Sequence, residues 1–300
     1  MLRLNQIRDF LTVLDCGSVR AAAARLGVSQ PAVTKSVRSL EAELGVELLR
    51  RSTSGVTATV AGAAFAARAR VAQLELQRAR EEVGGSGGRA NQALNIGLGS
   101  APLAFLGTGP LVQFLASHPD TRMHIMEGPG QTLLPLVRDG TIDLALVQRV
   151  EPSAAPGLKY RPLIRTPLVV VGRKGHPLSK ARSLAELRCA RWLIYRPPKS
   201  HGVLEDAMRA EGVPFPTNYV QCESFALTAA LLRDSDLLGL LVPQALASQY
   251  GNGLQEIPLK RPLPEISVGM YRRADTPTSE SVSDLWGHLL RAVREHSART

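Results

Sequence analysis

A twelve-residue stretch near the start of the chain carries side chains of the types that read double-stranded DNA. The sequence SQPAVTKSVRSL (29–40) predicts a helix with an apolar side formed by Val33, Val37 and Leu40. Its other side carries an amide, a hydroxyl and two cations, on Gln30, Thr34, Lys35 and Arg38. An amide can pair with adenine in the major groove, and cations neutralise phosphates. The pattern favours a recognition helix; the alternative is a three-helix bundle whose polar face meets only solvent.

The preceding residues predict two helices that would hold this one in place. They are expected over 4–16 and 19–26, because Gly17 interrupts the apolar pattern and Ser18 can cap the second helix. Alanines at 21–24 let another helix pack closely against it. A cap at Ser29 and Pro31 in the first turn then begin the third helix.

A short hairpin is expected directly after the third helix. Residues 46–59, VELLRRSTSGVTAT, suit two strands with a turn near Gly55. Such a wing would bring its cations to the phosphate backbone. The residues expected to contact DNA are therefore Ser29, Gln30, Pro31, Thr34, Lys35, Arg38, Arg50 and Arg51.

Residues 2–62 resemble the DNA-binding domain of the LysR-type transcriptional regulators. The resemblance is carried by Phe10, by GSVRAAAARLGVSQPAVTKSVRSLEAELGVELLRR (17–51), and then by Gly55, Val56, Thr59 and Gly62. The chain departs from the usual residues of the family at Leu48-Leu49, Ala58-Thr59 and Thr34. The first of these departures should loosen the packing of the wing slightly, and Thr34 keeps a hydroxyl.

The resemblance implies both a fold and a set of partners. The expected fold is α/β, with a winged helix-turn-helix at 1–59, a linker and dimerisation helix with a hinge at 60–90, and an effector domain at 91–300. The effector domain would have two lobes, like periplasmic binding proteins, with lobe I at about 91–162 and 267–300 and lobe II at about 163–266. The implied partners are double-stranded promoter DNA, a small-molecule effector, RNA polymerase, and further copies of the chain in a homodimer or homotetramer.

An apolar seam runs along the expected linker helix. Its members are spaced 4, 3, 4, 3 and 4 residues apart, the spacing by which two helices wrap around each other. The alternative is a helix that lies on its own domain. The resemblance favours a dimer through this seam, which consists of Phe65, Ala69, Ala72, Leu76, Ala79 and Val83.

The third segment alternates apolar runs with helical patterns, which predicts a parallel or mixed sheet covered by helices. Strands are expected within 93–99, 121–127, 142–148, 167–172, 191–195, 219–223 and 266–271. Two stretches, 133–147 and 228–242, echo each other as a helix, an acidic turn and a buried strand.

Ligands in such sheets bind beyond the carboxyl ends of the strands, in the crevice between lobes. Helix starts facing a crevice favour an anion, so a carboxylate or sulfonate is expected. The alternative for several of these residues is a role as helix caps only. The effector half also resembles, weakly, regulators of aromatic-sulfonate or sugar catabolism. The expected effector-binding residues are Ser100, Ala101, Pro102, Gly130, Gln131, Thr132, Gln148, His201, Gly202, Glu223, Ser224 and Phe225.

Composition and missing motifs weigh against other classes of protein. The net charge is +10, half of it in the first 90 residues, and aromatic residues make up only 4%; the latter argues against stacking platforms for single strands. No catalytic, phosphate-binding or metal-binding motif is present, which disfavours an α/β enzyme with an N-terminal dimerisation module. A non-specific architectural DNA protein would not need so large a second domain.

Cysteine usage and the start of the chain indicate a reducing compartment. We expect no cofactor, no metal and no membrane span, and a cytoplasmic location. Cys189 and Cys222 lie in strand-like surroundings, which predicts buried structural thiols rather than a redox pair.

Overall fold

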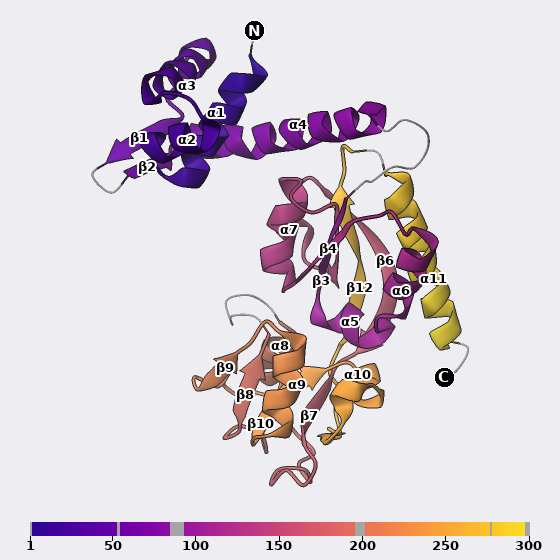
Figure 1. Cartoon of the computed structure of the whole chain (residues 1–300). Helices are drawn as coiled ribbons and strands as arrows, with labels where there is room; N and C mark the ends of the chain where they lie inside the picture. Colours follow the sequence, from indigo (N-terminus) through magenta and orange to yellow (C-terminus); the bar gives the residue numbers. More distant parts are fainter. Residues whose placement is uncertain (1, 53–54, 85–92, 196–201, 277, 298–300) are drawn as a thin grey trace. The chain divides into compact units, whose positions relative to one another are not determined.

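The computed structural model describes residues 2–52, 55–84, 93–195, 202–276 and 278–297. The chain divides into two compact units, the first formed mainly by residues 1–92 and the second mainly by residues 93–300 (Figure 1). Each unit is described by itself.

Three helices and a hairpin form the first unit, as the sequence predicts. The helices are α1 (Leu4–Cys16), α2 (Val19–Leu26) and α3 (Gln30–Leu44). Each is followed by a glycine in the left-handed conformation, which ends the helix without a steric penalty. The hydroxyls of Ser18 and Ser29 accept hydrogen bonds from the backbone of Ala21 and Ala32, both at 3.4 Å, and so cap α2 and α3.

The core of this unit joins the three helices to the start of α4 (Val60–Gly84). Phe10, Val33 and Leu40 are fully buried within it. The ring of Phe65 from α4 packs edge-on against Phe10, with the ring centroids 5.7 Å apart. The buried alanines of α2, Ala22 and Ala23, confirm the close helix packing that their small size predicts.

The hairpin is tied to the rest of the unit through backbone groups. Strands β1 (Leu49–Ser52) and β2 (Gly55–Ala58) pair antiparallel. One carboxylate oxygen of Glu41, on α3, accepts hydrogen bonds from the amides of Leu48 and Leu49 at 2.8 and 3.1 Å. Gly62 is required in α4, because a side chain there would lie 1.9 Å from the Leu48 carbonyl oxygen. The hairpin therefore has a fixed position beside α3.

The first sheet of the second unit has the strand order β4-β3-β5-β12-β6. Its strands are β3 (Leu94–Leu98), β4 (Met123–Glu127), β5 (Leu144–Gln148), β6 (Leu158–Pro167) and β12 (Glu265–Arg273). Strand β3 runs parallel to β4 and β5, whereas β12 runs antiparallel to β5 and β6. The sheet is thus mixed.

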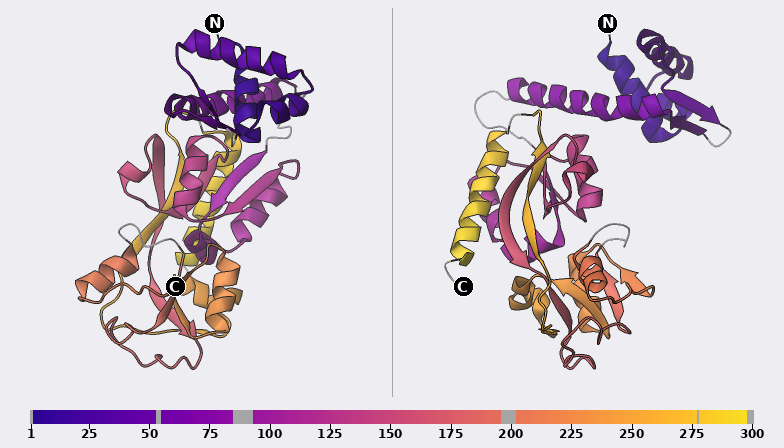
Figure 2. Two further views of the ribbon diagram at one scale, coloured as in Figure 1. Left: turned by 90° about the vertical axis from the view of Figure 1, so that its left-hand side faces the viewer. Right: turned by 180° about the vertical axis from the view of Figure 1, so that it is seen from behind.

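Helices cover both faces of this sheet (Figure 2). One face packs against α6 (Gly109–Ser117) and α11 (Glu280–Ser297), and the other against α7 (Gly130–Arg138). The short helix α5 (Ser100–Leu106) begins directly after β3, and a 3-10 turn (Pro152–Ala154) follows β5. Sheet and helices together form lobe I.

Lobe II is built on a second mixed sheet, with the order β11-β7-β10-β8-β9. Its strands are β7 (Val169–Arg173), β8 (Arg191–Ile194), β9 (Tyr219–Gln221), β10 (Leu237–Leu241) and β11 (Leu254–Glu256). Strand β8 is parallel to β9 and β10, and β7 is antiparallel to β10 and β11. The remaining elements are α8 (Val203–Ala210), α9 (Phe225–Arg233), α10 (Pro243–Ala247) and a 3-10 turn (Gln249–Gly251).

The chain passes between the lobes twice. It leaves lobe I after Pro167, where β6 ends, and returns at Glu265, where β12 begins. The first crossing follows Pro167, because β6 stays paired with β12 up to that residue.

Each of the seven stretches expected to be strands overlaps one, and β7 and β12 extend beyond the expected bounds. The two echoing stretches also form the same arrangement, with α7 leading into β5 and α9 into β10. The prediction for the cysteines is wrong in part: Cys222 is buried as expected, but Cys189 is exposed. None of the helices in the described part has the length and apolar content that a bilayer crossing requires.

We expect Glu41→Ala to loosen the hairpin. Two backbone amides would lose a charged acceptor, and hydrogen bonds to charged groups contribute about 1.5–3 kcal/mol each. Amide exchange at Leu48 and Leu49, followed by mass spectrometry, should accelerate at least about tenfold. Glu47→Ala is the matched control, since the Glu47 side chain is exposed. Unchanged exchange in Glu41→Ala would show that the carboxylate does not hold the hairpin.

Candidate DNA-reading face and effector pocket

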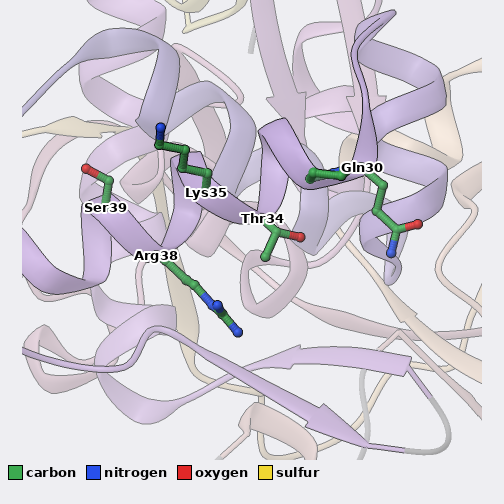
Figure 3. A pocket seen from close by; sticks show the side chains of 6 residues that line it. Gln30, Thr34, Lys35, Arg38 and Ser39 are labelled. Atoms are coloured by element: carbon green, nitrogen blue, oxygen red, sulfur yellow. The ribbon is translucent and has the colours of Figure 1, made fainter.

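The polar side of α3 forms a shallow groove on the first unit. The side chains of Gln30, Thr34 and Arg38 extend toward the same side of the helix in Figure 3. Lys35 and Arg38 are exposed, and Thr34 is half-buried. The groove is lined by Gln30, Pro31, Thr34, Lys35, Arg38 and Ser39.

Burial of the opposite face of α3 determines the direction in which this polar face points. Val33, Val37 and Leu40 are buried in the core, which turns the polar residues outward. Within the described part of the chain, no carboxylate forms an ion pair with Lys35, Arg38 or the exposed Arg50 of the hairpin. These cations are therefore available to bind an external anion.

The structure places most of the DNA-contact candidates on one region of the unit. Ser29 and Pro31 occupy the start of α3, where Ser29 is the cap. Arg50 lies in β1 opposite Thr57. The backbone of Arg51 is part of β1, but its side chain lies outside the described residues.

The residues of the linker seam lie in two different environments. Phe65 and Ala69 pack into the core of their own unit, whereas Ala72 is exposed and Leu76 is 41% exposed. The side chains of Ala79 and Val83 lie outside the described residues. Only the part of the seam beyond Ala69 is therefore available to a second chain among the residues described.

A cavity of about 140 Å³ lies between the two lobes of the second unit. It is about the size of an engineered protein cavity that holds benzene. Most of its wall is apolar, and the side chains come from both lobes. It is lined by Ser100, Ala101, Gln148, Leu168, Leu193, Ile194, Tyr195, Val203, Leu204, Glu205, Phe215, Phe225, Thr228, Leu240, Leu241 and Ile266.

Four of the residues expected to bind effector line this cavity, namely Ser100, Ala101, Gln148 and Phe225. His201 lies outside the described residues. The cavity wall as described does not include Pro102, Gly130, Gln131, Thr132, Gly202, Glu223 or Ser224.

Several of these remaining residues have a local structural role instead. Ser224 caps α9 by accepting a hydrogen bond from the Leu227 amide, and Gly202 is the cap of α8. The Glu223 carboxylate accepts a hydrogen bond from the Gln221 side chain at 3.5 Å. The cap alternative therefore describes Ser224.

Two hydroxyl groups in the cavity wall were not anticipated from the sequence. Tyr195 directly follows β8, and Thr228 lies one turn into α9, three residues after Phe225. The hydroxyl oxygen of Thr228 is buried and has no hydrogen-bond partner among the described residues, and that of Tyr195 lies beside Ser100. The position of Tyr195 at the carboxyl end of a strand was the sequence signal for it.

A carboxylate joins the two lobes beside the cavity. Glu127, the last residue of β4 in lobe I, accepts a hydrogen bond from the amide of Phe225, the first residue of α9 in lobe II. Burial, followed by the negative charge of Glu127, raises the pKa of the Tyr195 phenol above its usual range. The neighbouring Ser100 lowers this pKa by a smaller amount. Like an ordinary tyrosine, Tyr195 is neutral at physiological pH and can donate a hydrogen bond.

Two family models match this chain. Residues 4–63 match a model described as bacterial regulatory helix-turn-helix protein, lysR family. Residues 87–294 match the LysR substrate binding domain. The HTH-type transcriptional regulator PcaQ of Agrobacterium fabrum is 28% identical over 298 residues, which cover 98% of this chain and 94% of PcaQ.

Solved structures show the same fold. ArgP from Mycobacterium tuberculosis has a TM-score of 0.73 and 20% identity and covers 98% of both chains. CbnR in complex with its target DNA has a TM-score of 0.65 and 21% identity, with 97% of this chain and 100% of CbnR covered. These matches confirm the fold class expected from the sequence.

The unpartnered hydroxyl of Thr228 predicts an unusual stability effect. Thr228→Val keeps the shape but removes a buried polar group without a partner, so unfolding of the second unit should become about 1 kcal/mol less favourable. Trp192 and Trp286 both lie in this unit, and their fluorescence during urea unfolding measures the change.

Thr166→Val is the matched control for this prediction. Thr166 is also buried, but its hydroxyl donates to Gln244 at 3.3 Å, so its replacement should destabilise the unit by about 1 kcal/mol. Equal destabilisation by both substitutions would show that the Thr228 hydroxyl has a partner.

Proposed function

The chain belongs to the LysR family of transcriptional regulators, and from this membership we propose that it reads promoter DNA through the outer face of α3. The proposal rests mainly on one observation: the cations of that face are exposed and unpaired among the described residues, while the opposite face of α3 is core. The relatives are named as regulators, so the alternative of an enzyme has no support from them.

The side chains of this face divide into base contacts and phosphate contacts. Gln30, at the start of α3, has the amide that can bond adenine at two positions. Thr34 can bond a base or a phosphate, and Lys35 and Arg38 supply positive charge. Arg50 and Arg51 of the hairpin are assigned to phosphates beside the groove, where they would fix the register without reading sequence.

Two copies would bind a two-part site through the exposed part of the α4 seam. Ala72 and Leu76 supply apolar surface that lies outside the domain core. A dimer joined there would set the spacing of two recognition helices, and hence of two half-sites. Pairing of dimers into tetramers is a further step that the family membership suggests.

A small effector bound between the lobes would shift the protein between conformations of different DNA-binding behaviour. The carboxylate or sulfonate expected from the sequence would have to lie close to Glu127 and Glu205, and none of the described wall residues is cationic. RNA polymerase is proposed as the partner that responds to the bound regulator, and the cytoplasm of a bacterial cell as its location.

Gln30→Ala should relax base preference rather than abolish binding. Loss of a two-point base contact costs about 1–3 kcal/mol on specific DNA and little on random DNA. Fluorescence anisotropy with the promoter fragment flanking the gene, and with a shuffled fragment, measures this difference. Gln113→Ala, an exposed glutamine of lobe I, is the control. A loss of equal size on both fragments would contradict base reading by Gln30.

Arg50→Ala should weaken binding to both fragments alike. Removing one phosphate contact lowers the slope of log affinity against log salt by about one. The same anisotropy titrations between low and moderate salt give the slope. Arg122→Ala, an exposed arginine of the second unit, should leave it unchanged. A change confined to the promoter fragment would assign Arg50 to a base instead.

Leu76→Glu should convert the dimer to monomers at micromolar concentration, because the introduced carboxylate of one chain would lie close to the same carboxylate of the partner chain and repel it. Sedimentation velocity measures the mass, and Gln73→Glu, exposed one turn earlier, is the control. Both residues are exposed, so the fold should survive. A Leu76→Glu protein that stays dimeric would place the dimer contact elsewhere.

A further inference from the structure

The amide end of α9 is already occupied by a carboxylate of the chain itself. Glu127 reaches from the end of β4 in lobe I and accepts the hydrogen bond of the first amide of α9 (strand and helix are labelled in Figure 1). A helix start carries partial positive charge and is the usual position for an anion. An anionic effector would therefore have to displace Glu127 from this position or bind next to it.

The cavity behind this contact has the properties of a site for an uncharged molecule. The Phe225 ring, one residue into α9, is part of its wall. Among the sixteen described residues of its wall, ten are Leu, Ile, Val or Phe, and Glu205 is the one charged residue of those described. An anion moved into this wall would lose its hydration without gaining a cation among the described residues.

Two buried hydroxyls give the cavity its hydrogen-bonding character. Thr228 is only 7% exposed, and its hydroxyl oxygen lacks a partner among the described residues. The Tyr195 hydroxyl lies in the same wall, beside Ser100. Buried hydroxyls without partners are costly, and a ligand oxygen that accepts from them would remove this cost.

We propose that the effector is an uncharged, ring-sized molecule whose carbonyl or hydroxyl oxygen bonds to Tyr195 and Thr228, while Glu127 takes the place of an effector anion at α9. This inference rests on the proposed function, because it names the ligand class of the same pocket. Glu127 acts here as a positioning residue: it joins the lobes and, by its charge, excludes carboxylates from the cavity.

Pairs of probes that differ only in charge test the ligand class. We would titrate the full chain with benzamide and benzoate, and with phenylacetamide and phenylacetate, using calorimetry and the thermal shift of the second unit. The amides should bind and raise the melting temperature in proportion to their occupancy. Each acid should bind at least about tenfold more weakly than its amide. An acid that binds as tightly as its amide, or a failure of both amides to bind, would overturn the proposal.

Two variants test the residues. Thr228→Val should weaken binding of whichever amide the wild type takes by about five- to tenfold, the effect of one hydrogen bond. Glu127→Gln keeps an acceptor for the Phe225 amide but removes the charge, so benzoate binding should improve about tenfold and approach that of benzamide. Glu295→Gln, on the exposed surface of α11, is the control. Unchanged benzoate binding in Glu127→Gln would remove Glu127 from the proposal.

Promoter binding by the same preparations separates this inference from the proposed function. If the amides fail to bind while salt-dependent, sequence-selective DNA binding persists, the ligand class is wrong and the regulator proposal stands. If selective DNA binding is absent, the regulator proposal fails whatever the probes do.

Discussion

The DNA-binding unit depends on the two faces of α3, one of which must be buried and the other exposed. Val33, Val37 and Leu40 must be buried to join this helix to α1 and α2, and the same burial fixes the direction of the polar face. The Glu41 carboxylate, on the same helix, holds the start of the hairpin through two backbone amides. One helix therefore positions both the side chains that we propose to read bases and the cations of the hairpin. An error in the packing of α3 would displace both at once.

The second unit shows a different relation between stability and function. Thr166 and Thr228 are both buried, yet only Thr166 has a hydrogen-bond partner among the described residues. A fold selected for stability alone would place valine at position 228. The unpartnered hydroxyl of Thr228 lines the cavity between the lobes. A ligand acceptor for this hydroxyl would recover its cost as affinity, which is how polar groups in an apolar pocket provide selectivity.

Local signals predicted most of the fold, and non-local packing accounts for what they missed. Caps and glycines marked α1, α2 and α3, and apolar runs marked seven strands. Strand β6 was missed because Pro162 and several charged residues break its apolar pattern. A strand at the edge of a sheet tolerates such residues, and β6 is at the edge. Thr228 was missed for a similar reason: only the folding of α9 against β10 shows that a hydroxyl in an apolar helix faces a cavity.

The seam of α4 shows why spacing alone does not identify a partner. Core packing and coiled coils place apolar residues at the same intervals of three and four. In this chain one continuous seam serves as domain core at Phe65 and Ala69 and then becomes exposed at Ala72 and Leu76. A helix is stiff over these few turns. A second chain that docks on Leu76 would therefore contact the side of α4 that, nearer its start, packs into the core of the first chain's own unit. The exposed part of the described seam consists of Ala72 and Leu76, so it buries little apolar area. A dimer formed there would need additional apolar surface, and the first unit leaves Leu2, Leu4 and Val60 exposed.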